Sequence, residues 1–80
     1  MTDQAVLDAF TRILCDLLDD ETIVLTNQTE RRDVPNWDSF NYVNFIVSVE
    51  MEFGVQFGVA DVENFQTVGD IVTRMRALAG

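Results

Sequence analysis

Residues 33–46 read DVPNWDSFNYVNFI and pass from a turn into a helix within a few positions. Pro35 disfavours helical backbone at the residue before it, so no helix continues through this point. Asp38 and Ser39 follow, and both residue types cap helices by accepting hydrogen bonds from free N–H groups of the first turn. Apolar residues then recur at helical spacing as far as Phe53, and Gly54 is a typical terminator. The sequence therefore predicts a helix over 39–53.

This predicted helix has two apolar faces. At about 100° per residue, one face holds Tyr42, Phe45, Ile46, Val49 and Phe53, and the opposite face holds Phe40, Val43, Val47 and Met51. One of the faces belongs to the core. The other is either an exposed strip that marks a binding site or a second buried face beneath neighbouring helices. Periodicity alone favours neither.

Three further helices are predicted around the central one. Apolar residues at three- and four-residue intervals predict a helix over 3–18, with Thr2 or Asp3 as its cap. A short helix is expected over 60–64. The last is expected over 67–78, because Thr67 and Asp70 have the spacing of a capping box before an apolar run. The predicted fold class is all-α, a single domain over 1–80 built as a small bundle of three main helices and one short helix.

A long connection over about 19–38 separates the first two helices. Its centre is polar and rich in turn-forming residues, so we expect a loop without regular structure. Ile23 and Leu25 are two positions apart and are expected to attach this loop to the core by alternation.

The composition excludes several classes of chemistry. The 80 residues include 5 basic and 14 acidic ones, which gives a formal net charge of −9, and the basic residues are all arginines. With neither histidine nor lysine there is no imidazole relay, Schiff base or P-loop. The single cysteine, Cys15, lies among core positions and is interpreted as small packing. We therefore expect a protein that is not an enzyme and has no metal site.

The charge also limits the partners. A surface this acidic repels nucleic acid and anionic membranes and attracts basic proteins. The N-terminus lacks the basic start and apolar run of a signal peptide, so we expect a cytoplasmic protein. We also expect a monomer.

Residues 33–46 resemble the segment around the attachment serine of the acyl carrier proteins, which have a D-S-L sequence or a close variant there. Two later stretches extend the resemblance: EFGVQF at 52–57 is similar to the end of the second helix in that family, and FQTVGDI at 65–71 is similar to the entry to its last helix. The ordered set covers nearly the whole chain and is far more specific than the D-S pair alone.

The resemblance implies that Ser39 carries covalent 4′-phosphopantetheine and that Asp38 is the acidic residue before it. A phosphopantetheinyl transferase would install this arm, and acyl groups would be held on it as thioesters for enzymes with basic docking surfaces. It also implies that one face of the second helix contacts these partners. The expected interface residues are Phe40, Val43, Asn44, Val47, Glu50 and Met51.

Departures from the family pattern bear on the subclass. Housekeeping fatty-acid carriers usually have carboxylates at the positions of Asn41 and Asn44, and Trp37 resembles small free-standing carriers of specialised pathways, such as those for lipids or polyketides. We therefore expect the specialised type. Two alternatives are an aminoacyl or peptidyl carrier and an unmodified acidic helical adaptor.

Overall fold

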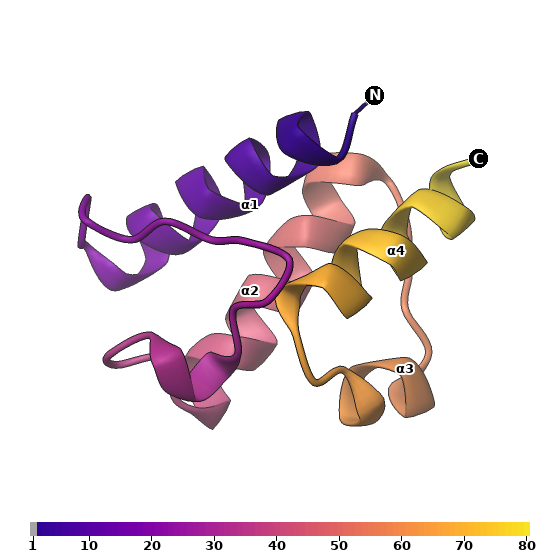
Figure 1. The fold of residues 1–80 in the computed structure, drawn as a ribbon. Coiled ribbons are helices and arrows are strands. Elements are labelled where there is room, and N and C mark those ends of the chain that lie inside the picture. The colour runs from indigo at the N-terminus through magenta and orange to yellow at the C-terminus, as the bar shows by residue number, and fades with distance from the viewer. Residues whose placement is uncertain (1) are drawn as a thin grey trace.

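The computed structural model describes residues 2–80, and within them it shows four α-helices and one short 3-10 helix, η1 (Figure 1). The predicted all-α fold, with three long helices and one short one, is confirmed. The elements in chain order are α1 (Asp3–Leu18), η1 (Arg31–Asp33), α2 (Ser39–Phe53), α3 (Val59–Asn64) and α4 (Val68–Ala79).

Two helices differ by one residue from their expected bounds. α3 begins at Val59 rather than at residue 60, because Gly58 is its N-cap. α4 spans 68–79 rather than 67–78, because Thr67 is an N-cap with extended backbone. The Thr67 side chain accepts a hydrogen bond from the Asp70 N–H over 3.2 Å, and the Asp70 carboxylate accepts one from the Thr67 N–H over 3.1 Å. The predicted capping box is therefore confirmed.

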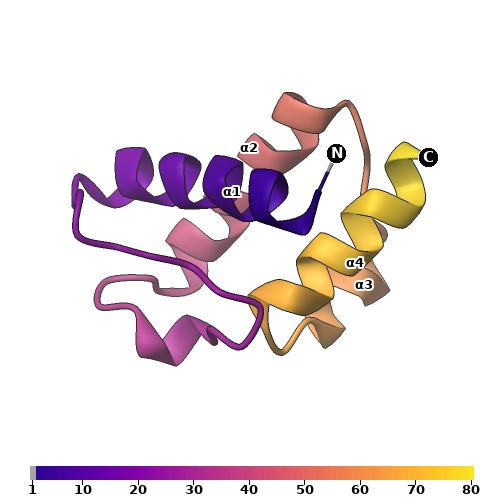
Figure 2. The ribbon, with the colours of Figure 1, turned by 45° about the horizontal axis from the view of Figure 1, so that its top comes forward.

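α1 packs against both α2 and α4 (Figures 1 and 2). The Thr2 hydroxyl caps its start by accepting a hydrogen bond from the Ala5 N–H, and Asp19 ends it in the left-handed conformation, at φ 52°. The apolar stripe predicted for this helix is buried from Val6 to Leu14. In both views the start of α1 and the end of α4 lie at the same end of the molecule, where Arg76 pairs with Asp3.

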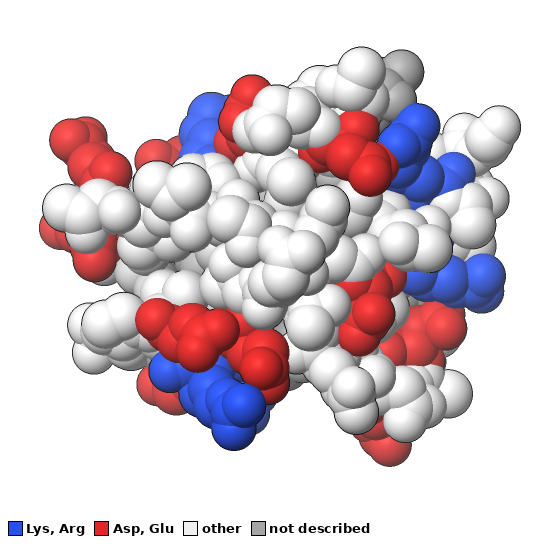
Figure 3. Space-filling view, viewed as in Figure 1, with Lys and Arg blue, Asp and Glu red and all other residues white. Residues whose placement is uncertain are grey.

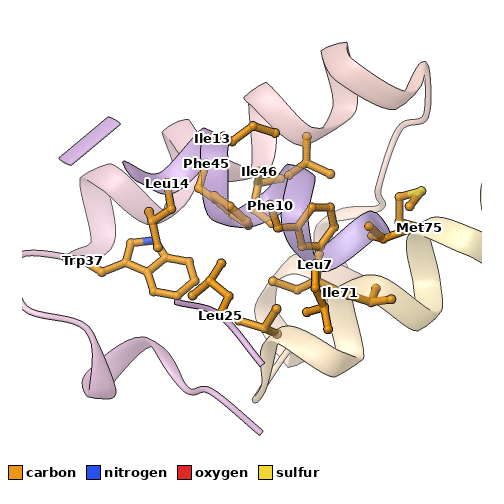
Figure 4. Close-up of a cluster of buried hydrophobic side chains, with 14 of the residues drawn as sticks. Leu7, Phe10, Ile13, Leu14, Leu25, Trp37, Phe45, Ile46, Ile71 and Met75 are labelled. Carbon is orange, nitrogen blue, oxygen red and sulfur yellow. The ribbon is translucent and has the colours of Figure 1, made fainter. Parts of the chain in front are cut away.

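Side chains from α1, α2, α4 and the long loop meet in one hydrophobic cluster (Figure 4). Phe45 of α2 lies at its centre, fully buried. The Phe10 ring contacts it edge-on, with ring centroids 5.5 Å apart, and the Trp37 ring contacts it in the same way at 5.2 Å. Such T-shaped pairs add a directional preference to the apolar burial. The start of α2 is therefore attached to the core through Trp37.

The long loop over 19–38 is more ordered than expected, because residues 31–33 form η1. The Glu30 N–H donates to the Asp33 carboxylate over 2.9 Å, and this local hydrogen bond supports the turn. Ile23 and Leu25 are buried while Val24 between them is exposed, which confirms the predicted alternation.

Two backbone hydrogen bonds join this loop to the start of α4. The Val68 N–H donates to the Thr29 carbonyl oxygen over 2.8 Å, and the Gly69 N–H donates to the Asn27 carbonyl oxygen over 3.0 Å. These N–H groups belong to the first turn of α4, where no intrahelical acceptor exists. The loop thus caps α4, and both ribbon views show the two segments side by side.

No helix among residues 2–80 combines the length and the apolar character needed to cross a membrane.

Candidate functional site

Ser39 is the first residue of α2, and its side chain is exposed. Of the two capping residues that the sequence offers, Asp38 is the cap: its Oδ1 accepts a hydrogen bond from the Asn41 N–H over 2.9 Å. Because Asp38 serves as the cap, the Ser39 hydroxyl is not needed for capping, and no residue in the range 2–80 hydrogen-bonds to it. The serine thus presents a free hydroxyl at the positive end of the α2 dipole.

The segment before Ser39 is held in place on both sides. Asn36 has a left-handed backbone, at φ 69°, and its carbonyl oxygen accepts a hydrogen bond from the Asn41 side chain over 3.1 Å. Asparagine adopts this conformation more readily than most residues. The next residue, Trp37, is only 5 % exposed and packs between Tyr42 and Phe45. The loop therefore enters α2 in a fixed direction.

A pocket of about 650 Å³ opens beside Ser39. Its walls come from η1, the start of α2 and the segment around α3, and they include Trp37, Tyr42, Val62 and Phe65. The Tyr42 hydroxyl donates a hydrogen bond to the Val62 carbonyl oxygen over 2.8 Å, which joins α2 to α3 across the pocket. Burial raises the pKa of Tyr42 above its ordinary 10.0, and the nearby Arg31 guanidinium opposes part of that rise.

The second apolar face of α2 is exposed. Phe40, Val43, Val47 and Met51, called here the apolar strip, are between 45 % and 80 % exposed, whereas Phe45, Ile46 and Val49 on the other face are buried. Tyr42 and Phe53 of the core face are partly buried. The structure thus decides between the two alternatives that the sequence left open, because no neighbouring helix covers the apolar strip.

The polar residues expected to contact partners have different environments. Asn44 is half-buried beside the apolar strip. The Glu50 carboxylate accepts a hydrogen bond from the Phe57 N–H over 2.7 Å, so this side chain holds the link between α2 and α3.

Most of the five arginines are paired with carboxylates. Arg12 pairs with Glu52, Arg32 with Glu30, Arg74 with Asp61 and Arg76 with Asp3. Figure 3 shows blue and red atoms side by side over η1 and at the edge near α4. The exception is Arg31, which pairs with no carboxylate of the described chain and lies over the Tyr42 ring, 5.2 Å from its centroid. Among residues 2–80 no group of three or more acidic or cysteine side chains is arranged to hold a metal ion.

The sequence model of a family described as "Phosphopantetheine attachment site" matches residues 8–75. An acyl carrier protein of Thermotoga maritima is 36 % identical over 56 residues, which are 70 % of this chain and 69 % of that protein. The chain belongs to the acyl carrier protein family. The solution structure of the holo acyl carrier protein of Geobacter metallireducens has a similar fold, with a TM-score of 0.82 and 35 % identity over 90 % of this chain and 83 % of that one.

Membership of the acyl carrier protein family implies a covalently attached 4′-phosphopantetheine, and carriers of this family are not catalysts. The site fits such a group: an exposed, unbonded serine hydroxyl stands at a helix start, next to a pocket with polar and apolar walls.

Several residues of this site were not identified from the sequence. The sequence shows only that Trp37 resembles a residue of other carriers, whereas the structure shows it buried and packed against the core. Arg31, Val62 and Phe65 reach the pocket through tertiary contacts between segments far apart in the chain. The one available signal was the pair Arg31-Arg32, two of only five cations, placed shortly before the serine.

Proposed function

We propose that Ser39 is the residue that carries 4′-phosphopantetheine, and that this protein presents acyl groups on that arm to partner enzymes. The observation that supports this best is that two adjacent residues have different roles at the start of α2. Asp38 caps α2 through its carboxylate, and Ser39 is left exposed with a free hydroxyl. The chain has only one other serine, Ser48, which is partly buried within α2.

The chain itself supplies no general base for this modification. The carboxylate nearest in sequence, Asp38, already accepts a hydrogen bond from the Asn41 N–H, and the sequence contains no histidine. A phosphopantetheinyl transferase would therefore remove the proton from the Ser39 hydroxyl. The serine oxygen would form the new bond to phosphorus as the pyrophosphate bond of coenzyme A breaks and adenosine 3′,5′-bisphosphate leaves. When attached, the arm supplies a terminal thiol that forms thioesters with acyl groups. Cys15 has no part in this chemistry, because it is packed against the core.

The apolar strip of α2 is the proposed docking surface for the partner enzymes. It begins at Phe40, directly after the attachment serine, and extends along α2 to Met51. Asn44 and Glu50 flank it and are proposed to contribute polar contacts. A net charge of −9 would speed encounter with basic partner surfaces, while the apolar side chains supply short-range contact. Such contacts should be weak, because a carrier must dissociate from each enzyme once that enzyme has acted on the acyl group. We expect the carrier to act as a monomer in the cytoplasm.

The proposed pathway is a specialised acyl pathway, such as lipid or polyketide synthesis, rather than housekeeping fatty-acid synthesis. Asn41 and Asn44 are neutral where housekeeping carriers usually have carboxylates. The structure gives Asn41 another use, because its side chain bonds to the Asn36 carbonyl oxygen and so helps to position the segment before Ser39.

The test is the intact mass of the protein after incubation with coenzyme A, magnesium and a broad-specificity transferase. We expect a gain of one phosphopantetheine in the natural protein and in Ser48→Ala, and no gain in Ser39→Ala. Modification of Ser39→Ala would exclude Ser39 as the attachment residue. No gain in the natural protein with two different transferases would favour an unmodified adaptor. If the holo protein can be loaded with an aminoacyl group but not with a fatty acyl or polyketide acyl group, the aminoacyl carrier is favoured.

A further inference from the structure

Arg31 is an exposed arginine that lies against an aromatic ring and pairs with no carboxylate among residues 2–80. Its guanidinium lies over the Tyr42 ring, 5.2 Å from the ring centroid. The neighbouring Arg32 pairs with Glu30 at 3.2 Å, and no residue within 2–80 forms a comparable ion pair with Arg31. In a chain with a net charge of −9, a cation that no carboxylate neutralises is unusual. A cation–π contact holds such a group in place without neutralising it.

The position of Arg31 relates it directly to Ser39. Tyr42 lies three residues after Ser39 on α2, and residues at this spacing are neighbours on one side of a helix. The Arg31 guanidinium therefore rests on a residue that lies about one helical turn from the serine. Arg31, Tyr42 and Ser39 also line the same pocket of about 650 Å³.

We propose that Arg31 binds the phosphodiester of the arm attached at Ser39. This inference rests on the proposed function. A phosphodiester has two non-bridging oxygens that share one negative charge, and the planar guanidinium donates to such a pair through two parallel N–H groups. The attachment atom is Ser39 Oγ, so the phosphodiester is the part of the arm nearest to the serine. Arg31 would thereby direct the base of the arm toward η1 and the mouth of the pocket.

The pocket also has acidic groups, which oppose an anion. Glu30 is neutralised by Arg32, and the Asp38 carboxylate is engaged at the α2 cap, whereas Glu63 also lines the pocket. The surroundings as a whole would not attract a free phosphate. A covalent tether removes this difficulty, because it keeps the phosphodiester near Arg31 at a high effective concentration. Arg31 is therefore inferred to position an attached arm and not to capture a free anion.

The experiment compares holo proteins by phosphorus NMR, because the phosphodiester of the attached arm is the source of their phosphorus signal. The variants are Arg31→Gln and, as the matched control, Arg32→Gln, which removes the same charge from the adjacent position of the same pocket. Circular dichroism verifies that both variants are folded. We expect the phosphorus resonance to shift in Arg31→Gln and to stay unchanged in Arg32→Gln. In the natural protein, the Arg31 Nε–Hε signal should move when the apo form is converted to the holo form. Both effects should shrink at about 1 M salt, where the Debye length is near 3 Å.

Three results would overturn the inference. The first is an unchanged phosphorus resonance in Arg31→Gln, and the second is an equal shift in Arg32→Gln. The third is a shift that appears only when the thiol carries an acyl group with a free carboxylate, because the bound anion would then be the cargo. Absence of any mass gain in the natural protein would instead overturn the proposed function, and the inference with it.

Discussion

Gly69 and Asn27 touch through their backbones, although 42 positions separate them in the chain. The Gly69 N–H donates to the Asn27 carbonyl oxygen over 3.0 Å, and a Cβ atom at position 69 would lie 2.7 Å from that same oxygen. The contact joins the long loop to the first turn of α4. Glycine is required here for close approach and not for an unusual backbone angle.

The first prediction concerns this contact. Gly69→Ala should lower the free energy of unfolding by about 1–3 kcal/mol, because the new methyl group forces the loop away from α4. Urea unfolding followed by circular dichroism measures the change. Gly58→Ala is the control, since a Cβ there would meet only the Asp61 carboxylate, at an ordinary 3.5 Å. An equal decrease in the free energy of unfolding for the two variants would contradict the proposed steric clash at Gly69.

The second prediction compares two phenylalanines of α2. Phe45 is fully buried and Phe40 is 73 % exposed. Phe45→Ala should cost about 3–5 kcal/mol, as expected for a large core side chain. Phe40→Ala should change stability by less than about 0.5 kcal/mol, as is usual for surface positions. Thermal unfolding of both variants tests this, and a similar melting temperature for the two would show that Phe45 is not the centre of the core.

The third prediction separates docking from folding. Val47 belongs to the apolar strip, while Val49, two residues later, is fully buried. Val47→Asp should reduce the kcat/KM of a partner enzyme acting on the holo protein and leave the circular dichroism spectrum unchanged. Val49→Asp places a charge in the core and should unfold the domain. If Val47→Asp unfolds as well, the apolar strip belongs to the core and the proposed docking surface fails.

The fourth prediction concerns acid stability. Hydrogen bonds from the Gln66 and Thr67 N–H groups hold the pKa of Asp70 below its ordinary 3.8. A lowered pKa in the folded state means that the stabilisation is present above the unfolded value and is lost as the pH falls through the folded value. Asp70→Asn should therefore destabilise the protein at neutral pH, and the difference from the natural protein should narrow below about pH 3.

Urea unfolding at several pH values measures this difference. The control is Asp16→Asn, which removes the same charge from an exposed carboxylate of α1. A difference between Asp70→Asn and the natural protein that stays constant from neutral to acid pH would show that the capping box does not depend on the charge of Asp70.

The parts of the fold that depend on local spacing could be predicted from the sequence. Helix caps depend on residues within one helical turn. The sequence indicated the cap at Thr67, and it narrowed the other two to Thr2 or Asp3 and to Asp38 or Ser39, of which the structure shows Thr2 and Asp38. The two faces of α2 followed from helical periodicity, but which face is exposed depends on how α1 packs, and a single sequence does not show that.

Tertiary contacts explain what the sequence did not show. The buried ring of Trp37 depends on the placement of Phe45, and the position of Arg31 depends on Tyr42 reaching it from another segment. Glu50 has the pattern of a solvent-facing residue on the helical wheel, yet its carboxylate caps the Phe57 N–H after the chain has turned at Gly54. These roles require the folded path of the loops, and helical periodicity contains no information about that path.

Trp37 gives this carrier an internal optical reporter. It is the chain's one tryptophan, and its buried ring forms part of the wall of the pocket beside Ser39. Its indole N–H has no hydrogen-bond partner in the described chain. Indole emission responds to the polarity and hydrogen bonding around the ring. A group that enters or leaves this pocket would therefore change both the wavelength of maximum emission and the fluorescence intensity. The position of the cargo could thus be followed during turnover in the natural protein, without a label.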